Sequence, residues 1–162
     1  MDHEKAKECC PVFNPDIWQG KEHRWQDRLF IMETMPQFFH IPFPSKIGKM
    51  MDRQWKKIED ANAAPEMADF LWLSYDPSPW KAEHYIAVTR DVPNAENVKI
   101  SGSFISKVFD GPYNAASRWI KEMDKYLADQ GKKSRKYYFY YTTCPKCAKK
   151  HGHNYVVLFA QI

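Results

Sequence analysis

The chain has 162 residues, of which 44% are hydrophobic and 15% aromatic, which is enough to fill one sizeable core. Its formal charge of +4 arises from 24 basic and 20 acidic side chains, an excess too small and too dispersed to indicate a nucleic-acid-binding protein. No apolar run of about 18 residues could span a bilayer, and the first residues are charged where a signal peptide is apolar. We therefore expect a cytoplasmic protein that contacts neither membrane nor nucleic acid directly.

The first 24 residues carry charge, two prolines and no apolar periodicity. They predict an irregular N-terminal arm, with Phe13, Ile17 and Trp18 as its anchors. A single domain is expected over residues 25–162.

Two elements are predicted in the first part of this domain. Residues 28–41 are expected to be extended and bent at Pro36, and residues 43–62 to form a helix with Ser45 as its N-cap. The apolar side chains of that helix fall on one stripe, formed by Ile47, Met51, Trp55 and Ile58.

Three strands are predicted next, over residues 69–75, 82–92 and 98–109, the first two joined by a proline-rich turn.

A second helix is predicted within residues 110–131. Asp110 or Gly111 can cap it, Pro112 suits the first helical position, and Gly131 lies where a helix end favours a positive φ. Its apolar stripe consists of Ala116, Ile120, Met123 and Leu127, with Trp119 and Tyr126 beside it.

Two closing strands, 136–141 and 154–162, flank a segment rich in cysteine and histidine. The predicted order is thus strand, helix, strand, strand, and this order occurs twice along the chain. This order predicts an α+β fold made of two βαββ units, with a ligand-binding cleft between the paired units.

The segment between the closing strands contains Cys144, Cys147, His151 and His153, which are zinc-ligand types. A closed zinc site is one interpretation, although strong zinc motifs separate their ligand pairs by more residues. A metal-free hairpin tip with reduced thiols is the preferred one, so no cofactor is expected. Redox chemistry is the third alternative; it is disfavoured because this CxxC joins two strands rather than preceding a helix.

The stretches "SGSFISKVFDGPYNAASRWIKEMDKYL" and "YYFYYTTCPKCAKKHGHNYVVLFAQI" resemble the second half of the GyrI-like small-molecule-binding family. The resemblance covers about residues 28–162. It implies two βαββ modules with pseudo-twofold symmetry around a central pocket, which in multidrug-sensing members binds aromatic cations.

The family's cation-binding pattern has a glutamate two residues before a tyrosine on the penultimate strand. If Tyr141 is that tyrosine, Phe139 occupies the glutamate position. A ring stacks and excludes water without adding charge, so a neutral flat aromatic ligand is expected. The aromatic-rich, CxxC-bearing sequence is also similar to the cyclopropanoid cyclopropyl hydrolases, a subfamily that detoxifies DNA-alkylating compounds of the yatakemycin and CC-1065 type.

Aromatic residues are the principal candidates for binding such a ligand. The predicted substrate-binding rings are Trp72, Tyr75, Trp80, Tyr85, Phe104, Tyr113, Trp119, Tyr137 and Phe139.

Catalysis would need a base for water and a donor for a carbonyl oxygen. Glu83 or Glu122 are the predicted bases, with His84 as a further candidate, and Tyr141 is a predicted donor. Tyr75, Tyr85 and Tyr113 are alternative donors.

Two alternatives remain beside this hydrolase hypothesis. One is a protein of the same fold that binds or sequesters drugs without catalysis, and the other is a small zinc protein that contacts nucleic acid through its basic stretch 131–150. The sequence leaves the oligomeric state open.

Overall fold

The computed structural model describes residues 13–142 and 152–162, and it divides the chain into two compact units. Unit 2 is Arg24–Gly102, and unit 1 joins the residues up to His23 to Ser103–Ile162. The boundaries fall inside two long strands, β1 (Lys21–Phe38) and β5 (Glu96–Asp110). Each unit has its own hydrophobic core.

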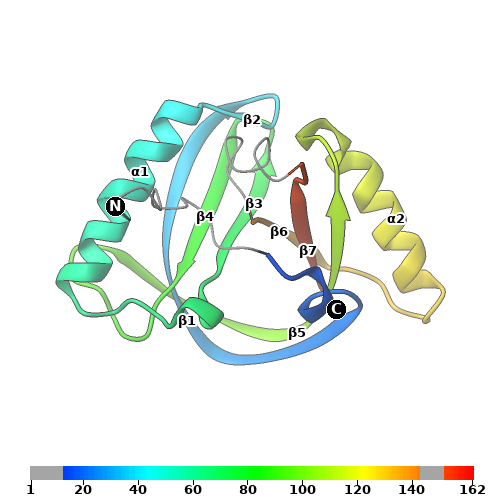
Figure 1. Ribbon diagram of the computed structural model, residues 1–162, viewed down its shortest axis with the longest axis horizontal. Coiled ribbons are helices and arrows are strands. Elements are labelled where there is room, and N and C mark those ends of the chain that lie inside the picture. Colours follow the sequence, from blue (N-terminus) through cyan, green and yellow to red (C-terminus); the bar gives the residue numbers. More distant parts are fainter. Residues whose placement is uncertain (1–12, 143–151) are drawn as a thin grey trace, which may run out of the picture. The chain divides into compact units, whose positions relative to one another are not determined.

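Unit 2 contains most of β1, followed by β2 (Ile41–Pro42), α1 (Pro44–Asp60), β3 (Trp72–Ser78) and β4 (Lys81–Ala87). Neighbouring strands pair antiparallel, β1 with β2 and β4, and β4 with β3. In Figure 1, α1 runs alongside these strands.

Unit 1 contains the second half of β5, then α2 (Ala116–Ala128), β6 (Lys136–Tyr141) and β7 (Tyr155–Gln161). Strand β7 pairs antiparallel with both β5 and β6, and α2 runs alongside them (Figure 1). Apart from the two-residue β2, the chain thus follows the order strand, helix, strand, strand from β1 to β4 and again from β5 to β7, and the predicted α+β class is confirmed.

Helix α1 matches its predicted range, but its start and its buried face differ in detail. Pro44 occupies the first turn and Phe43 is the N-cap residue, so the predicted cap Ser45 lies inside the helix. The buried residues are Met50, Gln54 and Ile58, at successive spacings of four. The predicted apolar stripe did not include the centre of this buried face, because the residue there is a glutamine, Gln54.

Helix α2 begins later than its capping signals predicted. Pro112 precedes a short 3-10 turn, Tyr113–Ala115, and α2 starts at Ala116. Trp119, Met123 and Leu127 form its buried face, so Trp119 is central rather than lateral. At the other end, Gly131 has the predicted positive φ, 68°.

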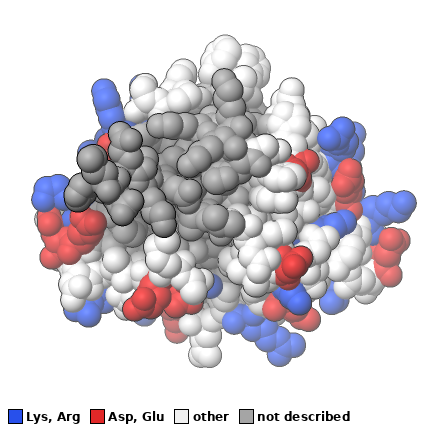
Figure 2. All heavy atoms as spheres, in the orientation of Figure 1, with Lys and Arg blue, Asp and Glu red and all other residues white. Residues whose placement is uncertain are grey.

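Charged side chains of both signs intermix around the face of the molecule shown in Figure 2. Among the residues described, no helix is long and apolar enough to cross a membrane.

Candidate functional site

The sheet of unit 2 has one face toward α1 and one face away from it. Ile31 and Ile86 lie on the α1 side, where they form a core cluster with Ile58 of the helix. Because side chains alternate along a strand, Glu83 and Tyr85 of β4 point to the opposite face. We call this opposite face, with Phe30, Tyr75, Glu83 and Tyr85, the aromatic face of unit 2.

A carboxylate and a phenol are joined on this aromatic face. The Tyr85 hydroxyl donates a hydrogen bond to Oε2 of Glu83. Tyr85 is buried, with its ring edge-on to Phe30 at 6.3 Å between centroids, while Glu83 is half-buried. Tyr75 of β3 lies directly opposite Glu83 in the strand register. The structure thus brings together three of the predicted site residues, with a carboxylate that can accept a proton or orient water.

Trp72 and His84 lie on the other face, beneath α1. The Trp72 indole N–H donates to Nδ1 of His84 at 3.0 Å, and the Ser74 hydroxyl lies 3.1 Å from the same nitrogen. Burial lowers the pKa of His84 to about 4, despite the opposing effect of Asp76 and Glu33. His84 is therefore neutral, with its proton on Nε2.

Trp80 lies at the β3–β4 turn and is 49% exposed. Its ring packs against Phe38 and Phe39 at the end of β1.

In unit 1, three of the predicted rings lie on the α2 side of the sheet. Trp119 is 2% exposed and stacks on Phe109 at 5.7 Å between centroids. Tyr137 and Phe139 of β6 pack against the same core. The Tyr137 hydroxyl donates to Asp124 of α2, and burial together with this carboxylate raises the pKa of Tyr137.

The other predicted residues of unit 1 are dispersed. Phe104 is fully buried on the face away from α2, 6.1 Å from the ring of Tyr138. Tyr141 stacks on Phe139 at 6.0 Å and is 36% exposed. Glu122 is exposed on α2, whereas Trp119, three residues earlier, is buried. The side chain of Tyr113 lies outside the described part of the chain.

The face of unit 1 away from α2 carries polar residues that sequence reasoning did not identify. Nε2 of His23 lies 2.7 Å from Oγ of Ser106, and that hydroxyl donates to the Trp18 carbonyl at 2.7 Å. Because serine has one hydroxyl hydrogen, Nε2 of His23 is the donor in the first bond. Ser106 is therefore not activated as a nucleophile in this arrangement. More than 80 residues separate this pair in sequence, so no local motif could indicate it.

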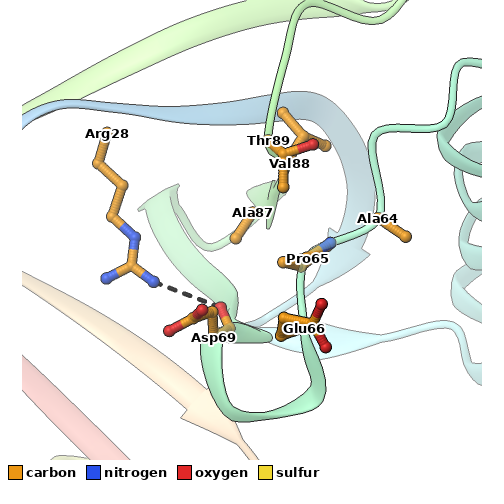
Figure 3. Close-up of a pocket in the computed structure, with 8 residues that line it drawn as sticks. All are labelled: Arg28, Ala64, Pro65, Glu66, Asp69, Ala87, Val88 and Thr89. Atoms are coloured by element: carbon orange, nitrogen blue, oxygen red, sulfur yellow. Dashed lines mark hydrogen bonds between the residues drawn. The ribbon is translucent and has the colours of Figure 1, made fainter.

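A cavity of about 410 Å³ lies in unit 2, lined by Arg28, Ala64, Pro65, Glu66, Asp69, Ala87, Val88 and Thr89. Figure 3 shows the Arg28 side chain pointing toward Asp69, whose carbonyl oxygen it reaches at 3.4 Å. The guanidinium also lies 4.8 Å from the Trp25 ring and 5.8 Å from the Phe30 ring. Burial lowers the pKa of Arg28, and Asp69 offsets part of that effect. None of the predicted site residues lines this cavity.

Of the four zinc-ligand candidates, Cys144, Cys147 and His151 lie outside the described residues. His153 is described, and its Nδ1 lies 2.7 Å from Oδ2 of Asp110, whose Oδ1 accepts from the Asn154 amide. Partial burial raises the pKa of Asp110, but these hydrogen bonds outweigh it and hold the pKa below its ordinary value. Within ranges 13–142 and 152–162, no three His, Cys, Asp or Glu side chains form a group suited to a metal ion. The zinc alternative stays a prediction.

Comparison with known proteins identifies both a family and a fold. A family model described as bacterial hydrolase matches residues 1–162, whereas no curated protein sequence matches the chain.

Three solved structures illustrate the shared fold. The EcmrR C-terminal domain has a TM-score of 0.65 at 12% identity, with 90% of this chain and 97% of that chain covered. A hydrolase from Listeria innocua has a TM-score of 0.60 at 11% identity, with coverages of 88% and 91%. SAV2435 bound to tetraphenylphosphonium has a TM-score of 0.51 at 11% identity, with coverages of 88% and 93%. At these identities the likeness shows the fold, and it is the GyrI-like fold expected from the sequence.

Proposed function

We propose, from the premise that the chain belongs to the bacterial hydrolase family, that it binds hydrophobic aromatic compounds and hydrolyses the cyclopropane of cyclopropanoid DNA-alkylating compounds. The observation that carries this proposal is the hydrogen bond from Tyr85 to Glu83 on the aromatic face of unit 2. Glu83 is a half-buried proton acceptor, and the half-buried ring of Tyr75 opposite it in the register is the one that a flat substrate would stack on. Two proteins of the same fold support the chemistry, one a hydrolase and the other bound to an aromatic small molecule.

The reaction opens a cyclopropane ring that is fused to a dienone. Water attacks the less hindered ring carbon as one ring carbon–carbon bond breaks. The electron pair of that bond moves into the ring system and forms a phenolate at the former carbonyl oxygen. Water loses one proton and the phenolate gains one, so the product equals substrate plus one water.

In this proposal Glu83 takes the proton from the attacking water, and the Tyr85 hydroxyl fixes the orientation of the carboxylate. Tyr75, opposite Glu83 in the register, donates to the developing phenolate oxygen. Glu83 is preferred over Glu122 as the base, because Glu122 lies exposed on α2. Among the predicted rings, Tyr75 and Tyr85 are assigned to substrate binding in unit 2.

The test is mass spectrometry of a CC-1065-type cyclopropanoid incubated with the protein, beside a control without protein. We expect a protein-dependent gain of one water. The Glu83→Gln variant should lose about 10²- to 10⁴-fold in rate, the usual contribution of a general base. Glu122→Gln is the matched control and should keep the activity of the natural chain. Trp119 is unsuited to this test because it lies in the core of unit 1, so its loss would report on folding.

Two results would contradict the proposal. Equal losses in the Glu83 and Glu122 variants would remove Glu83 from its role as the base. An intact substrate together with saturable quenching of tryptophan fluorescence would identify a sequestering protein without catalysis.

A further inference from the structure

Five large apolar side chains are exposed together at one end of unit 2. We call them the aromatic tip: Phe38, Phe39, Ile41, Phe43 and Trp80, with exposed fractions of 39% to 65%. Three of these rings contact one another, with centroid distances of 4.6 Å from Phe38 to Phe39 and 4.8 Å from Phe39 to Trp80. The upper edge of the face in Figure 2, where Figure 1 places β2, is correspondingly free of charged side chains. Exposed clusters of this kind usually mark interaction sites.

The backbone that presents the tip is strained. Phe39 and His40 form the two-residue turn between β1 and β2, and both have positive φ, 48° and 63°. Such turns favour Asn-Gly, and a bulky residue in this region is disfavoured by its side chain. The Phe39 ring is thus held outward at a cost to the stability of the fold.

Hydrogen bonds fix this turn against the β3–β4 connection. The His40 amide donates to the Pro79 carbonyl and the Gln37 amide to the Trp80 carbonyl, both at 2.9 Å. The buried Gln37 side chain donates to the carbonyls of Ser78 and Lys81. The tip is therefore preorganised, which lowers the entropic cost of binding a partner.

The surroundings of the tip restrict the kind of partner. Strand β2 is at the sheet edge, but Pro42 and the following Pro44 lack N–H groups, which disfavours pairing with an added strand. The Asp76 carboxylate, 2.8 Å from Nδ1 of His40, disfavours an anionic bilayer. Lys46 lies over the Phe43 ring and Lys81 follows Trp80, so the rim carries both signs of charge.

We infer that the aromatic tip is a self-association surface for a second copy of this chain. A twofold interface brings the same patch of both copies together, so a rim with both signs of charge can pair with itself. From the exposed fractions, the five side chains offer roughly 500 Å² per chain. Two copies would bury roughly 1,000 Å², the lower limit for a specific interface, so the dimer should be weak.

Sedimentation equilibrium over about 10 to 500 µM protein tests this inference. We expect a concentration-dependent dimer that Phe39→Asn weakens at least about tenfold, as expected for a central aromatic residue. Asparagine tolerates the positive φ, so this variant should keep its melting temperature although it loses the ring. Trp80→Ser is a second variant that should weaken the dimer, and Met67→Ser is the control, since Met67 is 74% exposed outside the tip.

Three outcomes would overturn the inference. The first is a natural chain that stays monomeric throughout this range. The second is a dimer that persists in both the Phe39 and Trp80 variants or is lost in the Met67 variant. The third is a monomer that co-sediments with vesicles of phosphatidylserine and phosphatidylcholine through the same residues, which would assign the tip to lipid.

Discussion

His84 is a buried imidazole whose protonation is coupled to folding. Its Nδ1 accepts hydrogen bonds from Trp72 and Ser74, and its Nε2–H, like Oε1 of Gln54 in α1, is buried with no partner among the described residues. Glu33, paired with Arg53 of α1, faces His84 in the strand register. This carboxylate and Asp76 raise the pKa of His84, but the larger effect of burial holds it at about 4, against an ordinary value of 6.5.

This coupling predicts loss of stability in mild acid. Above pH 6.5 His84 is neutral in both the folded and the unfolded chain, so it adds no pH dependence. Between pH 6.5 and 4 the unfolded chain binds a proton that the folded chain does not, so the free energy of unfolding falls. The limiting loss is about 3 kcal/mol. Urea unfolding between pH 7.5 and 4 measures it.

The His84→Gln variant provides the comparison for this pH dependence. Glutamine can accept a hydrogen bond from Trp72 but does not titrate. The difference in the free energy of unfolding between the natural chain and the variant should therefore shrink as the pH falls from 6.5 to 4. Parallel stability curves for both chains over this range would exclude His84 as the source.

At the scale of the elements, two glycines near α2 have different roles. Gly131 ends the helix in a Schellman arrangement, in which its amide donates to the Ala128 carbonyl and the Lys132 amide donates to the Leu127 carbonyl. Gly111 precedes the helix with a φ of 156°, and a Cβ placed there would lie 3.3 Å from Cζ2 of Trp119. Gly131 is needed for its positive φ alone, whereas Gly111 also leaves room for the buried Trp119 ring to pack closely.

The two alanine substitutions should therefore differ in cost. Gly131→Ala meets no atom within 4 Å and should lose about 1 kcal/mol, the penalty for a positive φ. Gly111→Ala must in addition displace the buried Trp119 ring, so its loss should be larger, about 2 to 3 kcal/mol. Thermal unfolding of both variants measures the difference. A smaller loss at Gly111 than at Gly131 would show that the Trp119 ring moves freely.

Element type was predictable from the sequence, but the orientation of each strand was not. Helical periodicity located both helices, and Gly131 marked the end of the second. Tyr137 and Phe139 share one face of β6, as the period-2 alternation of a strand requires. Alternation does not indicate which face meets the helix when both faces are aromatic, as they are between residues 137 and 141. Glu83 and Tyr85 of β4 likewise share a face, because residues two apart in a strand do so. The pair of His23 and Ser106 depends on tertiary pairing, which no local pattern encodes.

At the scale of the whole molecule, the two units differ in how their chain segments are connected. Unit 2 is one continuous segment, whereas unit 1 requires the N-terminal residues to meet a segment that begins at Ser103. Trp18 makes this long-range connection. Its carbonyl accepts from Ser106, and its ring lies edge-on to Tyr140 at 6.1 Å and to Phe159 at 5.6 Å between centroids.

This connectivity predicts that Trp18 docks late in folding. Closing a loop of more than 80 residues costs entropy before any contact compensates for it, so local contacts should form first. Trp18→Ala should therefore speed unfolding and leave the folding rate nearly unchanged, because its contacts are absent from the transition state. Stopped-flow folding and unfolding in urea separates the two rates. Ile17→Ala is the matched control, since Ile17 is 56% exposed and should alter neither rate. A slower folding rate in the Trp18 variant would instead place the N-terminal segment in the folding nucleus.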